Sequence, residues 1–349
     1  MSRQNTKMFI FTLRRLNLFI FTMLVLTLIS FSLSYLFPGD PVINLSGQLN
    51  SSEEQLALLN ENYHMQDNIL WQYWAYIEHI IQGDLGLSMS SQSPVLNEIM
   101  ILLPATIELS LVALLIAMFI GIPLGFIAAI KHNKTSDNII LSVAMFGYSI
   151  PVFWLGLLAI LFFSIGLGWL PSAGRISLLF EIDIITGVLF FDILLSDSPD
   201  KWQAFQDATA HIILPACVVA LAPATIFIRL ARASMIEVLE TSYIKAVKAK
   251  GLSFKQIIFR HALRNALIKI IRHVGLQFAN LVTIAMVTEV IFSWPGIGRW
   301  LIESIYQRDY TAIQSGLLVL SCFIFIVHIL TDFIYAALNP LARGVNHGS

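Results

Sequence analysis

Apolar residues along this chain gather into six long, nearly unbroken segments instead of alternating with polar ones. Each segment has about twenty residues or more, enough for a helix to cross ~30 Å of hydrocarbon at ~1.5 Å per residue. Interior prolines such as Pro151, Pro215 and Pro223 are tolerated where neighbouring groups satisfy the freed backbone. The pattern predicts an all-α integral membrane protein, a polytopic bundle of about six transmembrane helices. The predicted spans are 16–36, 103–130, 138–165, 208–231, 274–293 and 311–336.

The polar segment at about 37–102 is predicted to lie outside the membrane and to be helical in part. Ser51 or Ser52, together with Glu54, resembles a capping box at the start of one helix. A second helical stretch follows in "DNILWQYWAYIEHIIQ". The aromatic residues expected on the apolar face of this second helix are Trp71, Trp74 and Tyr76.

A second outer segment, at about 166–207, contains the apolar stretch "ITGVLFFDILL" (185–195). This stretch is too short to span a bilayer, so we expect a buried or re-entrant element instead of a seventh crossing. The expected organisation of the chain is an N-terminal tail with the first span (1–36), a polar segment outside the spans (37–102), a core domain of five spans (103–336) and a C-terminal tail (337–349).

Composition agrees with a membrane protein, because hydrophobic residues make up 57% and charged residues only 12% of the 349 positions. A soluble domain carries about a quarter charged residues. The apolar run after Arg14 and Arg15 is too long for a signal peptide, and no A-x-A-like site follows it, so we expect an uncleaved first helix. Cys217 and Cys322 lie in apolar runs, where they are expected to pack as small hydrophobes without a disulfide.

The distribution of charge predicts the orientation of the spans. With the N-terminus inside, all but four of the 21 Lys and Arg residues fall on the cytoplasmic side, as the positive-inside rule requires. The segment 37–102 carries eight acidic residues and no Lys or Arg. Both termini are therefore expected in the cytoplasm. The four basic residues outside are Arg175, Lys201, Arg299 and Arg308.

The loop at 233–273 is the long cytoplasmic segment, and it is rich in lysine and arginine. We expect one helix ending near Gly251, in a position typical of a helix C-cap, and a second helix beginning after Ser253 as its N-cap. Juxtamembrane basic segments often only obey the topology rule or touch anionic lipid, and composition alone favours that interpretation.

The spacing of Ala246, Gly251 and Leu263 is similar to the coupling-loop signature of the permeases of ABC importers. Lys245, Val247, His261 and Arg264 depart from the general signature in the way that the peptide/nickel branch does. The resemblance implies that this loop docks on an ATP-binding subunit. The loop residues that the resemblance implicates in coupling are Lys245, Ala246, Val247, Lys248, Ala249, Lys250, Gly251, Leu252, Ser253, His261, Leu263 and Arg264.

Further motifs in the same order resemble this branch along nearly the whole chain. They include "FPGDP" (37–41), "GDLGLS" (83–88), "LPATIELS" (103–110) and "TEVIFSWPGIGRWL" (288–301). The outer stretch 185–199 resembles a narrower group, the SapB-type peptide permeases. Asn339 stands where many relatives have Asp.

The resemblance implies an ABC type I importer permease fold, an inner-membrane location, and small peptides as cargo moved by alternating access. It implies a second, SapC-like permease subunit, two cytosolic ABC ATPases and a periplasmic solute-binding protein. Because the chain has no G-x-x-x-x-G-K-[ST] sequence, ATP and Mg²⁺ are expected on the ATPases and no cofactor in this chain. Residue spacing indicates no catalytic group, no metal site and no nucleic-acid partner; the surrounding partner is the lipid bilayer.

Charged residues inside spans are costly and are functional candidates by default. Glu108, Glu289 and Asp332 are the candidates for the translocation path, with snorkelling or helix capping as the alternative. Arg229 and Arg232 are expected to be interface residues or helix-dipole partners, with binding of the cargo as the alternative. "SWPGIGRW" (293–300) fits an interfacial aromatic belt or an outer gate equally well. The competing functions are polyamine (putrescine) transport, with export as one direction, a membrane hydrolase, and a scaffold or sensor.

Overall fold

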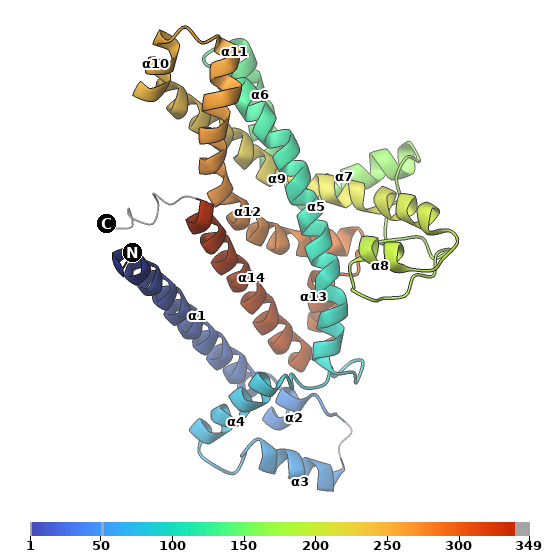
Figure 1. Ribbon diagram of the computed structural model, residues 1–349. Coiled ribbons are helices and arrows are strands. Elements are labelled where there is room, and N and C mark those ends of the chain that lie inside the picture. The colour runs from blue at the N-terminus through green and yellow to red at the C-terminus, as the bar shows by residue number, and fades with distance from the viewer. Residues whose placement is uncertain (1, 50–51, 339–349) are drawn as a thin grey trace. The chain divides into compact units, whose positions relative to one another are not determined.

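The computed structural model describes residues 2–49 and 52–338, and it is nearly all helical (Figure 1). Within those residues the β-type pairing is confined to one isolated antiparallel bridge between Leu87 and Pro94. The predicted all-α class is confirmed. By its contacts the chain forms two compact units, which are residues 1–105 with 295–326 and residues 106–294 with 327–349.

Within residues 2–49 and 52–338, five helices are long and apolar enough to cross a membrane, and they coincide with five of the six predicted spans. The helix Val95–Ile130 begins before its predicted limit, and the helix Lys201–Glu240 extends past both of its limits, because a helix can continue in polar residues beyond its apolar run. The helices are α1 (Ser2–Leu36), α5 (Val95–Ile130), α9 (Lys201–Glu240), α12 (Leu263–Ile291) and α14 (Tyr310–Leu338).

The sixth predicted span, 138–165, is broken in the middle. Helix α6 (Thr135–Ser149) ends at Ser149, and α7 (Val152–Ala159) restarts at an angle of 95° to it and continues as a π-helical segment to Gly166. Pro151 lacks an N–H, and it forces Ile150 into an extended conformation with ψ 127°. The expectation that Pro151 would be tolerated inside a helix is wrong, whereas Pro215 and Pro223 do lie inside the unbroken α9.

In the first unit, three short helices follow α1: α2 (Pro41–Ser46), α3 (Glu53–Asn62) and α4 (Ile69–Gln82). A small core that includes Phe31 of α1 and Tyr76 of α4 joins them. Ser52 caps α3 in a capping box with Gln55, not with Glu54 as the sequence suggested. The reason is that α3 begins at Glu53, so that Gln55 and not Glu54 stands three residues after the cap.

The first unit also holds α13 (Ile297–Gln307) and the part of α14 up to Ile326. The buried Asp309 accepts hydrogen bonds from the Ser88 hydroxyl at 2.6 Å and the Ser90 backbone N–H at 3.0 Å. It also accepts one from the N–H of Ala312 at the start of α14. This carboxylate therefore ties the loop before α5 to the start of the last span.

In the second unit, the apolar stretch 185–195 forms the seven-residue helix α8 (Leu189–Leu195). Its buried residues Leu189 and Ile193 pack against Ala204 and Ala208, near the start of α9. The stretch 185–195 therefore holds a short helix that is buried on one side, and that helix is not long enough to be a seventh span. Because α9 begins at Lys201, its first two turns precede the predicted apolar limit and provide this packing surface.

Candidate functional site

The first helix of the basic loop is shorter than the sequence suggested. Helix α9 ends at Glu240, Thr241 adopts an extended conformation, and α10 (Ser242–Ala249) starts anew. The Thr241 hydroxyl accepts a hydrogen bond from the N–H of Ile244 and acts as an N-cap. The prediction of one continuous helix up to Gly251 is therefore wrong, because a threonine side chain offers the backbone an alternative partner.

The turn after α10 is as the sequence predicted. Gly251 has φ +80°, in the left-handed region, and its N–H donates to the carbonyl of Lys248 at 3.0 Å. Ser253 caps α11 (Phe254–Gln256) in a capping box with Gln256. A Cβ at position 251 would meet no atom within 4 Å, so the demand for glycine comes from the backbone conformation and not from crowding.

The second helix of the loop is continuous with the fifth span. Helix α11 passes into a π-helical segment (Ile257–Ala262) and then directly into α12, which ends at Ile291. The inner face of α10 packs on this helix and on the end of α9 through the buried Ile244 and Val247. The loop thus forms a packed corner between two spans.

One polar contact fastens α10 to the second helix. The hydroxyl of Tyr243 lies 2.7 Å from Nδ1 of His261, and the two rings meet edge to face. His261 is one of the positions where the sequence departs from the general coupling signature. The sequence alone showed that His261 differs from the general signature. It did not show the contact with Tyr243, because the two residues lie on different helices and the turn at Gly251 brings them together.

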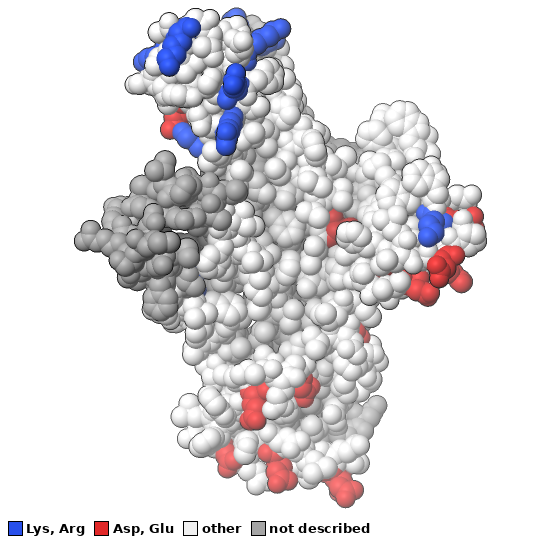
Figure 2. Space-filling view, viewed as in Figure 1, with Lys and Arg blue, Asp and Glu red and all other residues white. Residues whose placement is uncertain are grey.

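The outward face of the loop is cationic, and Figure 2 shows Lys and Arg gathered over α10 and α11. Two aromatic side chains, Phe254 and Phe259, are exposed among them. Of the residues that the resemblance implicates, Val247 is buried, whereas Leu252, His261 and Leu263 are partly buried. The exposed ones are Lys245, Ala246, Lys248, Ala249, Lys250, Gly251, Ser253 and Arg264.

A partly buried ion pair joins the last part of α9 to the first turn of α6. Arg232 donates from Nε and Nη2 to the two oxygens of Asp137, at 2.7 and 2.8 Å, and also contacts His132. Asp137 is 1% exposed. Arg232 is thus partnered within the chain, Arg229 is exposed, and their predicted roles stay predictions.

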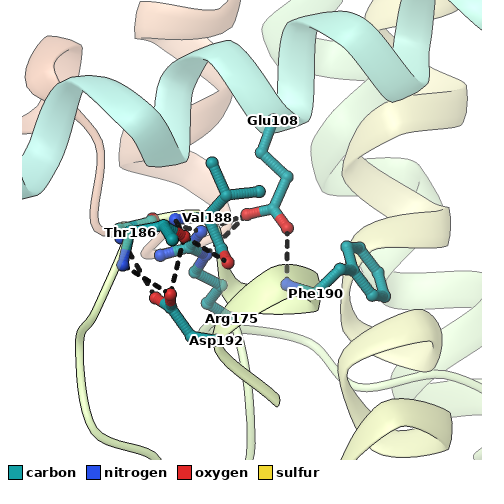
Figure 3. Close-up of polar contacts among 7 residues, drawn as sticks. Glu108, Arg175, Thr186, Val188, Phe190 and Asp192 are labelled. Carbon is teal, nitrogen blue, oxygen red and sulfur yellow. Dashed lines mark hydrogen bonds and ion pairs between the residues drawn. The ribbon is translucent and has the colours of Figure 1, made fainter. Parts of the chain in front are cut away.

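Glu108 of α5 is engaged by the outer segment (Figure 3). Its carboxylate accepts from Nε of Arg175 at 2.9 Å, from Nη2 of the same side chain, and from the N–H of Phe190 at 3.3 Å. Arg175 also donates to the carbonyl of Gly187. Asp192 accepts from Thr186 and Gly187, so two buried carboxylates organise this segment.

Glu289 lies elsewhere in the same unit. It is fully buried on α12, and the hydroxyl of Thr106 on α5 donates to it at 2.6 Å. Thr106 and Glu108 are two residues apart on one helix, so their side chains diverge by about 200°. The structure therefore does not bring Glu108 and Glu289 together. The side chain of Asp332 lies outside the described residues.

The two tryptophans of "SWPGIGRW" differ in burial, since Trp294 is buried and Trp300 is partly exposed. Trp294 is 1% exposed, and the Arg175 guanidinium lies 5.9 Å from its ring centroid. Trp300 donates from Nε1 to Glu98 at 2.7 Å. Both rings are held by protein groups, which the spacing of aromatic residues alone did not predict.

The family model of "Binding-protein-dependent transport system inner membrane component" matches residues 121–344, and the model of its N-terminal part matches residues 8–110. The chain belongs to this family. The resemblance drawn from the motifs is confirmed.

Curated members of the family are similar along almost their whole length. The "Di/tripeptide transport system permease protein DppB" of Pseudomonas aeruginosa is 41% identical, over 96% of this chain and 99% of the relative. The "Putrescine export system permease protein SapB" of Escherichia coli K12 is 43% identical, over 96% and 97%. The "Peptide transport system permease protein SapB" of Salmonella typhimurium is 41% identical, over the same shares.

Among solved structures, an inward-facing MetNI methionine ABC transporter is similar in fold. The TM-score is 0.50 at 17% identity, and the match covers 67% of this chain and 93% of that chain. At this identity the likeness shows the fold alone. The fold is that of an ABC importer permease. The family match, and not this likeness, makes the chain an inner-membrane component of a transport system.

Proposed function

We propose that this chain is the permease subunit of an ATP-driven transporter that moves small peptides across the inner membrane by alternating access. The observation that carries the proposal is the packed corner at 241–263, which joins α9 to α12 and presents a cationic face. The peptide cargo is supported by relatives named for di/tripeptide and peptide transport at about 41% identity.

The corner suits the transfer of mechanical work from separate ATPases. A partner that moves the exposed face of α10 would move α9 and α12 with it, because α10 packs on α9 and on the π-helical segment 257–262, which runs into α12 without a break. Packed elements of this kind shift as bodies between discrete arrangements, which is what alternating access requires. ATP and Mg²⁺ belong to those ATPases in this proposal.

The orientation follows from the same face. If the ATPases are cytosolic, then the loop 233–273 and both termini are cytoplasmic, in agreement with the positive-inside rule. The remaining partners in the proposal are a periplasmic solute-binding protein and a second, SapC-like permease subunit that completes the channel. The segment 37–102 is then periplasmic.

The three acidic candidates for the translocation path are not equally supported. Glu108 is held by Arg175, and Glu289 is held by Thr106, so each carboxylate is already bonded in this state. Glu289 sits on α12, the helix that the loop continues into, and a movement of α12 against α5 would release it from Thr106. We therefore favour Glu289 over Glu108, and Asp332 remains a candidate from the sequence alone.

A specific observation supports putrescine as a second candidate cargo. A relative at 43% identity is named for putrescine export, and that function requires the same machinery running outward with a cationic cargo. Buried carboxylates such as Glu289 would suit a diamine as well as a peptide amino group. One transport assay with both peptides and putrescine distinguishes the two candidate cargo classes.

The test uses the full complex in proteoliposomes, with labelled dipeptides, labelled tripeptides and labelled putrescine measured in both directions. Gly251→Val forces a β-branched residue into the left-handed region, at a cost of about 1–3 kcal/mol in the loop turn. We expect ATP hydrolysis with transport reduced at least tenfold, or loss of the ATPases from the complex. Gly251→Asn is the matched control, since asparagine tolerates this conformation.

Unchanged transport by Gly251→Val would overturn the coupling role. Transport of putrescine without transport of either peptide would instead replace the cargo and leave the coupling mechanism standing.

A further inference from the structure

Helix α4 has an apolar face that no described part of its unit covers. Leu70, Trp74 and Ile81 are 71%, 62% and 79% exposed. Their spacing of four and seven residues puts them on one face of the helix, with the partly exposed Ile77 between them. Trp71, which is 61% exposed, flanks this face.

The opposite face of α4 is buried and polar. It carries Gln72 and Tyr76, which are 9% and 7% exposed. The sequence predicts Tyr76 on one apolar face with Trp71 and Trp74, and that prediction is wrong. Tyr76 points into the protein, whereas the two tryptophans point away from it.

The hydrogen bonds of the buried face fix the level of α4 along the first span. The hydroxyl of Tyr76 lies 2.8 Å from that of Ser30, and the hydroxyl of Tyr73 lies 2.8 Å from that of Thr27. Gln72 accepts from Tyr35. Thr27 precedes the end of α1 at Leu36 by nine residues, which is ~14 Å of helix at ~1.5 Å per residue.

This level lies within the apolar span of α1, which is residues 13–36. Leu24, Leu28 and Ile29 of that span are each about half exposed, and in a membrane protein such side chains face lipid. The apolar face of α4 is therefore continuous with a surface that lipid covers. In Figure 1, α4 crosses the outer end of α1.

The ends and the charges of α4 fit the boundary between lipid and water. Asn68 caps its first turn, and Gly83, with φ 82°, closes its last turn, so both ends satisfy backbone groups locally. Tryptophan is enriched at this boundary. The helix has no Lys or Arg, so any attraction to the membrane comes from apolar burial and not from anionic headgroups.

We propose that α4 is an in-plane anchor, whose face of Leu70, Trp74, Ile77 and Ile81 is embedded at the outer headgroup and acyl boundary of the bilayer. The anchor holds the acidic segment 37–94 against the periplasmic surface of the inner membrane. This inference rests on the membrane location of the family and does not depend on the cargo.

The test places nitroxide labels on the full chain in nanodiscs. Cys217 and Cys322 are first replaced by serine, and single cysteines are introduced as Leu70→Cys, Trp74→Cys and Ile81→Cys. The matched control is Glu61→Cys, on the exposed surface of α3. We expect the α4 labels to collide several-fold more with oxygen than with a water-soluble nickel chelate, and the control label to show the reverse.

Two results would overturn the proposal. If the α4 labels behave like the label at position 61, the face is in water. If they are protected from both reagents, a protein partner covers it. Nanodiscs of neutral phosphatidylcholine should give the same depth as those containing phosphatidylglycerol, and a depth that needs the anionic lipid would contradict an apolar anchor.

A second measurement keeps the unlabelled chain intact. A lipid with a photoactivatable group near the top of its acyl chain is incorporated, and chymotryptic peptides are analysed, since no Lys or Arg occurs between Arg15 and Lys131 for trypsin to cleave. Adducts are expected in 69–82 and not in α3. Equal labelling of both helices would count against the anchor.

Discussion

Two short helices of this chain, α4 and α10, have opposite polarity. Helix α4 buries polar groups such as Gln72 and the Tyr76 hydroxyl and exposes Leu70 and Trp74, whereas α10 buries Ile244 and exposes Lys245. Each is amphipathic, so periodicity alone makes them equivalent. The difference teaches that the exposed face of a helix identifies its medium: lipid for α4, and water or a soluble partner for α10.

Reversing the polarity of α10 gives the largest expected effect. Ile244→Asp buries a carboxylate in a site that is 0% exposed, and an unpaired buried charge costs several kcal/mol. We expect the loop to detach from α9 and α12. ATPases should no longer co-purify with the permease, and the detached α10 should become sensitive to proteolysis.

Lys245→Asp is the control for this experiment, because it reverses a charge on the exposed face of the same turn. It should leave proteolysis of the loop unchanged and weaken ATPase binding in a way that depends on salt. If both variants retain their ATPases at every ionic strength, α10 is not part of the docking surface.

Removing one polar group from the buried face of α4 gives an intermediate effect. Tyr76→Phe leaves the hydroxyl of Ser30 without its partner at a buried position, which destabilises by about 1–2 kcal/mol. Burial raises the pKa of Tyr76 to about 12, which agrees with a hydroxyl kept from water. Hydrogen exchange of the α4 amides should accelerate about tenfold.

The same substitution at an exposed tyrosine is the control. Tyr306 of α13 is 83% exposed, so Tyr306→Phe should leave exchange unchanged throughout the first unit. Equal protection of α4 in Tyr76→Phe and in the unaltered chain would mean that its hydrogen bonds to α1 do not set its position.

The smallest expected effect is a pH dependence at the end of α4. A hydrogen bond from His79 lowers the pKa of Asp84, despite partial burial of that carboxyl. A carboxyl whose pKa is lower in the folded state stabilises above its unfolded pKa of about 3.9, and that contribution is lost as the pH falls through the folded value. Exchange at Gly83 and Asp84 should therefore rise at most a few-fold below pH 4, because Asp84 is half exposed.

Asp84→Asn tests the assignment, since an amide cannot titrate. Its exchange profile should be flat over the same pH range. A profile identical to that of the unaltered chain would assign the titration to another group.

Much of this fold could be predicted because a membrane span is determined by consecutive apolar residues. Five spans, the glycine turn and the Ser253 cap each depend on residues close together in the sequence. The break at Pro151 could not be separated from the tolerated Pro215 by sequence, because a proline bends or ends a helix according to which neighbours satisfy the freed carbonyls. The basic loop could be predicted as a segment of the sequence. Which of its residues are buried and which are exposed became known only from the structure.

The sequence by itself determined the fold class, the spans, the charge asymmetry that predicts orientation, and the position of the basic loop. Each depends on the hydropathy or charge of consecutive residues, because a segment that crosses a bilayer core without water must be apolar throughout. Only the tertiary structure decided that Glu108 pairs with Arg175, that Glu289 bonds to Thr106, and that Tyr76 turns inward while Trp74 turns outward. These pairings join residues that are far apart in the chain or on opposite faces of one helix. They are set by helix packing, which no local pattern encodes.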